Sequence, residues 1–213
     1  MKRLFDLTVS LVGLLVTAPL AAILAVLVKI DSRGPVLYGS ERIGRGGRPF
    51  RMFKFRTMVL NADQLGGTST PENDPRLTRM GRWLRATKLD ELPQLLNVVR
   101  GEMSLVGPRP QVAWAVALYT PEQRTLLHVR PGITDYASIR FRNEAELLKG
   151  SADPDLAYLE LVAPEKLRLG LQYVSHRTFA EDLRILAATI VSLCGGRPER
   201  LLPILQDEGM HQV

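Results

Sequence analysis

The chain has 213 residues, of which 28 are lysine or arginine and 22 are aspartate or glutamate, so its formal net charge is +6 at pH 7. The single cysteine, Cys194, excludes an internal disulfide, and three widely separated histidines argue against a zinc site. The positive charge favours a polyanionic partner but does not distinguish nucleic acid, anionic lipid and a phosphorylated substrate.

The N-terminal segment is strongly apolar. No charged residue lies between Leu7 and Val28, a stretch of about 33 Å as a straight helix, which is long enough to cross a bilayer. Pro19 lies in its middle and predicts a kink or a break. Lys2 precedes the run and Lys29 follows it, so both flanks favour the cytoplasmic side. A re-entrant helix–break–helix places both basic flanks on the cytoplasmic side, whereas a kinked spanning helix places only one there. These residues do not decide between the two arrangements.

The next segments predict a short β-hairpin. Strands are expected at 36–42 and 50–58, joined by the turn-prone stretch 44–47. A basic residue then recurs at every third position: Arg76, Arg79, Arg82, Arg85 and Lys88. Such a series is either a solvated helix face or, beside a membrane anchor, a face that contacts lipid or phosphate. With helices expected at 144–149, 155–161 and 179–193, the fold class is α+β and mostly helical.

A pair of acidic residues, Asp90 and Glu91, lies where a helix is expected to begin. The stretch 87–99 reads as helical, and Pro93 is tolerated only in a first turn, so the helix should start between Thr87 and Asp90. Carboxylates at that position cap backbone amides. The same position suits catalysis, because the helix dipole lowers a carboxylate pKa and keeps a nucleophile ionised.

A rigidly presented arginine follows. Arg109 lies between Pro108 and Pro110, which fix the backbone on either side, and Gly107 permits a tight turn before them. A guanidinium held in this way is suited to bidentate phosphate binding, although an arginine in a structural loop is the alternative.

Five motifs together resemble the bacterial sugar transferase family, the monotopic polyprenyl-phosphate phosphoglycosyl transferases. They are Lys54–Met58, Asn73–Thr78, Leu89–Leu95, Ser104–Pro110 and Arg130–Thr134. The resemblance extends from the N-terminus to about Ile190 and matches the small, catalytic-core form of these enzymes. One departure is Ala18 before Pro19, where related sequences often carry serine, so Thr17 would have to supply the hydroxyl that bonds the backbone.

The resemblance implies a mechanism. Asp90 would attack the β-phosphorus of a UDP-sugar, release UMP and form a covalent phosphosugar, which then passes to polyprenyl (undecaprenyl) phosphate. Glu91 would be its partner, and the two carboxylates would hold Mg²⁺. Further substrate-binding positions are Lys54, Arg56, Arg85, Arg109 and Asp182.

The resemblance also implies a location and a domain organisation. Residues 1–33 would form a re-entrant membrane helix, and residues 34–213 a catalytic domain on the cytoplasmic face of the bacterial inner membrane, contacting lipid through amphipathic interfacial helices. The reaction would be the first membrane step of glycoconjugate or exopolysaccharide biosynthesis. The sequence leaves the donor sugar, the glycan pathway and a homodimer open.

The rival of another class is a membrane-tethered, basic nucleic-acid-binding protein. It predicts a helix-turn-helix or an aromatic stacking sheet, and the sequence contains neither pattern, so no nucleic-acid partner is expected. A second rival is a glycosyltransferase that cleaves the sugar–phosphate bond. Release of UDP instead of UMP would identify it.

Overall fold

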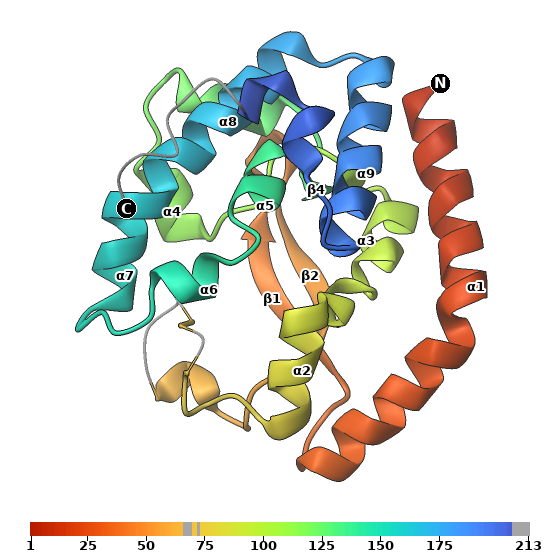
Figure 1. Cartoon of the computed structure of the whole chain (residues 1–213), viewed down its shortest axis with the longest axis vertical. Coiled ribbons are helices and arrows are strands. Elements are labelled where there is room, and N and C mark those ends of the chain that lie inside the picture. Colours follow the sequence, from red (N-terminus) through yellow and green to blue (C-terminus); the bar gives the residue numbers. More distant parts are fainter. Residues whose placement is uncertain (66–69, 72, 206–213) are drawn as a thin grey trace.

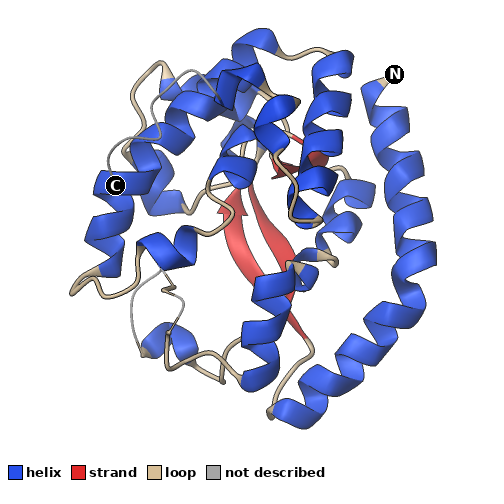
Figure 2. Cartoon of the chain, viewed as in Figure 1, coloured by secondary structure: helices blue, strands red, loops and turns tan. Residues whose placement is uncertain are grey.

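The computed structural model describes residues 1–65, 70–71 and 73–205. It confirms the expected mostly helical α+β fold with an antiparallel hairpin and one long apolar N-terminal helix. Helices surround the hairpin, which lies near the centre of the molecule (Figure 2).

The hairpin consists of β1 (Leu37–Ile43) and β2 (Pro49–Phe55), with Tyr38 opposite Lys54. Its second strand ends before the expected residue 58, and Met58 instead forms an isolated bridge with Leu77. Helix α3 (Gln94–Arg100) flanks β2, because the side chain of Asn97 accepts from the Phe53 amide at 2.9 Å and donates to the Arg51 carbonyl at 2.7 Å. Asn97 therefore satisfies backbone groups that the two-stranded sheet leaves without a partner.

A second, smaller sheet brings two distant loops together. Strands β3 (Ser104–Val106) and β4 (Gly132–Thr134) pair in parallel. A Cβ atom on Gly132 would lie 2.1 Å from the Gly107 amide nitrogen, so only glycine permits the chains to approach this closely. The loop that carries Arg109 is thereby held against the end of β4.

The remaining helices enclose this frame (Figure 1). They are α2 (Arg79–Thr87), α4 (Ala113–Ala117), α5 (Tyr136–Arg140), α6 (Glu144–Leu147), α7 (Pro154–Ala157), α8 (Ala163–His176) and α9 (Phe179–Leu193). A π-helical turn, Tyr158–Val162, joins α7 to α8. Helix α9 has the expected bounds, and its Ile185 packs in the main core with Val98, Met103 and Leu169.

Helix α1 (Lys2–Asp31) is helical throughout, so the predicted break at Pro19 is wrong, while the predicted kink is present as a bend in its middle (Figure 1). The hydroxyl of Thr17 donates to the Gly13 carbonyl at 2.6 Å, so Thr17 supplies the backbone-bonding hydroxyl that was expected of it. Such a bond to the preceding turn is a known cause of helix bending, and here it acts together with the proline.

Helix α1 packs along the domain and keeps its apolar face outward. Asp6 is buried and accepts from the Ser104 hydroxyl at 2.8 Å, while Leu24 and Val28 pack against Phe55 and Leu84. In its most apolar window, of mean hydropathy 2.7, only 11% of the residues are buried. The large side chains that remain exposed include Leu4, Leu11, Val12, Leu15, Val16, Ile23, Val26 and Ile30.

Candidate active site

The carboxylate pair lies in a tight turn between two helices. Helix α2 ends where Lys88 adopts a left-handed conformation, with φ of 59°, and a 3-10 turn, Leu89–Glu91, follows. Pro93 then precedes α3, which begins at Gln94. The predicted helix start between Thr87 and Asp90 is therefore too early, because the left-handed Lys88 reverses the chain and the pair occupies the turn before α3.

The two carboxylates have different surroundings. Asp90 is only 5% exposed, and the Lys54 ammonium lies 3.9 Å from its Oδ2, beyond hydrogen-bond length. Glu91 is held on both oxygens: Lys54 donates to Oε1 at 2.9 Å, and Arg109 donates to Oε2 at 2.9 Å and also to Oε1. Glu91 is thus the fixed member of the pair, and Asp90 the one with free acceptor capacity.

These surroundings shift the two acids in opposite directions. Burial raises the pKa of Asp90, and the positive charge of Lys54 opposes that shift without cancelling it. Burial also disfavours the ionised form of Glu91, but the charges and hydrogen bonds of Arg109 and Lys54 outweigh it and lower the pKa of Glu91. The expectation of a lowered pKa for Asp90 is wrong, because burial raises the pKa and Asp90 lies in the 3-10 turn before α3 instead of at the start of that helix.

Arg109 is fixed through its backbone as well as its guanidinium. Its amide donates to the Asp135 carboxylate at 3.2 Å, and Nη1 also donates to the Ile133 carbonyl at 3.1 Å. Asp135 is buried and caps α5 by accepting from the Ser138 amide at 2.7 Å. Sequence reasoning missed Asp135; the signal was an aspartate directly before a short helix, where this residue type often caps the first amides.

A cleft of about 2150 Å³ opens over the pair. Its lining includes Lys54, Arg85 and Arg109, three of the predicted substrate-binding residues, together with Lys88 of the predicted basic series and Arg42, which was not among the predicted site residues. Burial lowers the pKa of Arg42, and the neighbouring charge of Arg109 adds to the effect. Cations thus gather over the carboxylates without an equal number of acids, an arrangement suited to a substrate with several phosphate charges.

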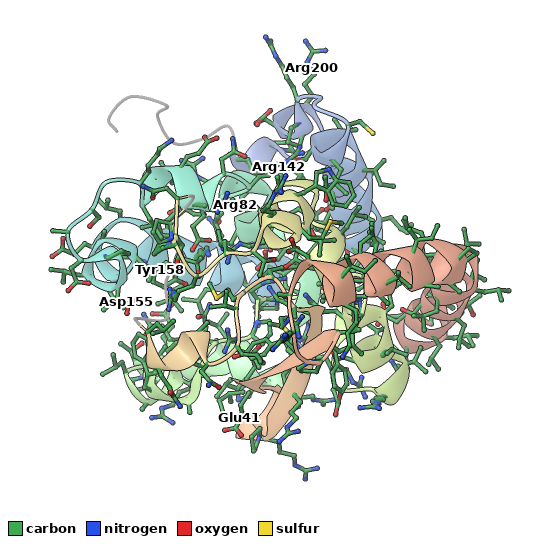
Figure 3. The ribbon with its side chains drawn as sticks, turned by 90° about the horizontal axis from the view of Figure 1, so that it is seen from below. Glu41, Arg82, Arg142, Asp155, Tyr158 and Arg200 are labelled. Atoms are coloured by element: carbon green, nitrogen blue, oxygen red, sulfur yellow. The ribbon has the colours of Figure 1, made fainter. Side chains whose placement is uncertain are left out.

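Further residues of the lining come from several elements. They are Arg82 on α2, Arg142 after α5, Asp155 on α7 and Tyr158 in the π-helical turn, all labelled in Figure 3. The cleft is larger than the usual 300–1,000 Å³ or so of a small-molecule site, so it offers room for an extended ligand.

Two of the predicted substrate-binding residues have their charged groups engaged elsewhere. Arg56 borders the cleft, but its guanidinium donates to the Pro35 carbonyl at 2.5 Å and to the carbonyl and hydroxyl of Ser32 at 2.6 and 2.8 Å. Asp182 does not line the cleft. It is buried and accepts from Lys2 at 2.6 Å and from the Tyr173 hydroxyl at 2.7 Å. The side chain of Arg56 thus contacts the C-terminal end of α1, and the side chain of Asp182 contacts its N-terminal end.

The predicted magnesium ligands, Asp90 and Glu91, supply two carboxylates, and no third acidic or histidine side chain joins them in the part of the chain that the structure describes. Within residues 1–65, 70–71 and 73–205 no group of three or more histidine, cysteine, aspartate or glutamate side chains gathers. Mg²⁺ is commonly held by one or two carboxylates, with water and substrate phosphates completing the shell, so Asp90 and Glu91 fit such a site. Asp90 has the more open oxygens, since Arg109 and Lys54 engage both oxygens of Glu91.

Comparison with known proteins identifies the family. The model of a family described as bacterial sugar transferase matches residues 1–196, from α1 to the end of α9. The chain belongs to the bacterial sugar transferase family. It is 38% identical over 211 residues to the exopolysaccharide production protein ExoY of Rhizobium meliloti, covering 92% of this chain and 86% of that protein.

Two further relatives of the family carry names that specify substrates. The undecaprenyl-phosphate glucose phosphotransferase of Komagataeibacter xylinus is 41% identical over 204 residues, covering 89% of this chain. The UDP-glucose:undecaprenyl-phosphate glucose-1-phosphate transferase of Caulobacter vibrioides is 36% identical over 195 residues, covering 90% of this chain and 69% of that protein. The chain spans only 35% of the Komagataeibacter protein, so the match covers one part of that larger relative.

Proposed function

We propose that this protein transfers a sugar 1-phosphate from a UDP-sugar to polyprenyl phosphate, releasing UMP, at the cytoplasmic face of the bacterial inner membrane. The observation that carries the proposal is the buried Asp90, which has free acceptor capacity, beside the ion-paired Glu91 under a surplus of cations. The names of the relatives, which include undecaprenyl-phosphate and UDP-glucose, support the substrate class.

In the first half of the reaction, an ionised oxygen of Asp90 attacks the phosphorus that carries the sugar. The bond from that phosphorus to the bridging oxygen breaks, and the electron pair leaves with UMP. Lys54 and Arg109, which Glu91 holds over the site, neutralise charge on the pyrophosphate as it is transferred. Mg²⁺, when bound, would be held by Asp90 and Glu91 and would supply further neutralisation of phosphate charge.

In the second half, a phosphate oxygen of the polyprenyl acceptor attacks the same phosphorus. The bond to Asp90 breaks, and the carboxylate leaves in its ionised form, ready for another cycle. Because burial raises the pKa of Asp90, the charge of Lys54 is needed to favour that ionised form.

The position of α1 supports a lipid acceptor. Its two ends are both tied to the domain, by Lys2 to Asp182 and by Arg56 to the carbonyls near Ser32. A helix tied at both ends to one domain keeps both ends on the same side of a membrane, with its exposed apolar face in the lipid. We infer the re-entrant arrangement from this, with the domain resting on the membrane surface.

The test is a UMP-release assay over a panel of UDP-sugars with undecaprenyl phosphate and Mg²⁺, followed by rapid quench with a UDP-sugar labelled in the sugar, without acceptor. Wild-type protein should become labelled at Asp90, while Asp90→Asn should remain folded and unlabelled. Glu91→Gln should be badly impaired, since it loosens the hold on Lys54 and Arg109. Glu122→Gln, at an exposed site outside the cleft, is the matched control.

Two results would contradict the proposal at different levels. An unlabelled wild-type protein with strictly sequential kinetics would remove the covalent step and leave Asp90 as a metal ligand. Release of UDP in place of UMP would show that the sugar–phosphate bond is the one that breaks.

A further inference from the structure

Gln94, the first residue of α3, is buried in an unusual way. Its side chain is 0% exposed, and neither Oε1 nor Nε2 has a hydrogen-bond partner among the residues that the structure describes. A buried amide without partners destabilises a fold, whereas methionine of similar shape would fill the same space without that penalty. Packing therefore does not account for a glutamine at this position.

The neighbours of Gln94 indicate what its amide could serve. Asp90, Gln94 and Asn97 are all buried; Gln94 and Asn97 lie three residues apart on α3, and Asp90 lies in the 3-10 turn that precedes this helix. The two flanking residues both approach β2, since Asp90 lies near Lys54 and Asn97 bonds the backbone of Arg51 and Phe53. Gln94 lies between them in the chain.

The carboxylate of Asp90 lacks a hydrogen-bond donor among the described residues, and the side-chain amide of Gln94 could supply one. Within the described part of the chain, its carboxylate accepts no hydrogen bond, and its ion-pair contact is Lys54 at 3.9 Å. A carboxylate that must attack in line needs one oxygen fixed so that the other points at the phosphorus. A glutamine has three side-chain torsions, so a change of rotamer redirects its amide without movement of the backbone.

We propose that Gln94 is a positioning residue, whose side-chain N–H donates to one oxygen of Asp90 while the other oxygen attacks the phosphorus. This inference rests on the proposed function of Asp90. In the covalent intermediate the same N–H bonds the carbonyl oxygen of the acyl phosphate, so the group stays oriented for attack by the acceptor. Gln94 itself touches no substrate.

The test compares Gln94→Met with wild type in three measurements: the thermal midpoint, the KM for the UDP-sugar, and the single-turnover rate of labelling at Asp90. The midpoint should be unchanged or higher, and KM should change little. The labelling rate should fall by about tenfold to a hundredfold, the effect of a misplaced reacting group. Gln172→Met is the matched control, because Gln172 also has a buried Oε1 without a described partner but lies on α8, far along the chain from Asp90. It should leave the labelling rate unchanged.

The outcomes separate this inference from the function on which it rests. If wild type labels at Asp90 and Gln94→Met labels at the same rate per folded molecule, the positioning role is overturned. If Gln94→Met lowers the midpoint and the amount of folded enzyme but not the rate per folded molecule, Gln94 is structural and the inference is again overturned. Failure of wild type to label contradicts the covalent mechanism itself.

Discussion

Replacement of Arg109 by lysine tests whether the site needs the shape of a guanidinium or only its charge. Arg109 donates two hydrogen bonds to Glu91 and one to the Ile133 carbonyl. Lysine keeps the charge, but its donors all lie on one ammonium nitrogen. It cannot bond both Glu91 oxygens and the Ile133 carbonyl at once, so at least one charge-assisted bond and the bidentate geometry are lost. At about 1.5–3 kcal/mol for each such bond, the loss of one or two predicts a fall of roughly 3 kcal/mol in transition-state stabilisation.

That free energy corresponds to a decrease of about a hundredfold in kcat/KM. The measurement is initial-rate UMP release over a range of UDP-sugar concentrations for Arg109→Lys and wild type. Arg100→Lys is the control, because Arg100 lies over the Phe53 ring, 4.8 Å from its centroid, and does not line the cleft. If Arg109→Lys retains kcat/KM within about threefold of wild type, the bidentate argument is refuted and Arg109 contributes only general positive charge.

Two further predictions concern topology and stability. Cysteines placed at positions 2 and 33 in a Cys194→Ser background should both resist a membrane-impermeant thiol reagent in intact cells, and labelling at position 2 alone would establish a spanning helix. Asp74→Asn should lower the free energy of unfolding near neutral pH by about 3 kcal/mol, because Asp74 is buried and paired with Arg76 at 2.6 Å. The hydrogen bonds from Arg76 lower the pKa of Asp74, so this stabilisation is present above the unfolded pKa of about 3.9 and is lost as the pH falls below it. Denaturation curves from pH 7 down to pH 3 should therefore converge for the two proteins, and parallel curves would contradict the assignment.

The sequence predicted the parts of this fold that depend on local chemistry. Alternation and turn residues located the hairpin, and the apolar periodicity located α9 with its bounds. The resemblance to the family assigned Lys54, Glu91 and Arg109 to one site, and the structure brings them together through ion pairs that the sequence did not predict. Local pattern was sufficient only for the hairpin and α9.

The remainder depended on packing between distant segments. The guanidinium of Arg56 caps the end of α1, and Asp182 binds Lys2, because α1 folds back along the domain and brings its ends to these residues. No local sequence pattern predicts these contacts at the two ends of α1. The pKa of Asp90 depends in the same way on how deeply the turn is buried, which overrides the helix-dipole argument made from its position alone.

The buried Asp6 on α1 has a consequence for how the protein is assembled. A buried carboxylate without partners is costly, and here the Ser104 hydroxyl and the Leu105 amide donate to Asp6 and offset that cost. Those partners exist only when β3 is formed, about a hundred residues later in synthesis. Helix α1 therefore gains its final position against the domain only once β3 has folded, so docking of the helix and folding of the domain form one cooperative step. During synthesis, α1 has no fixed place on the domain until the chain has passed β3.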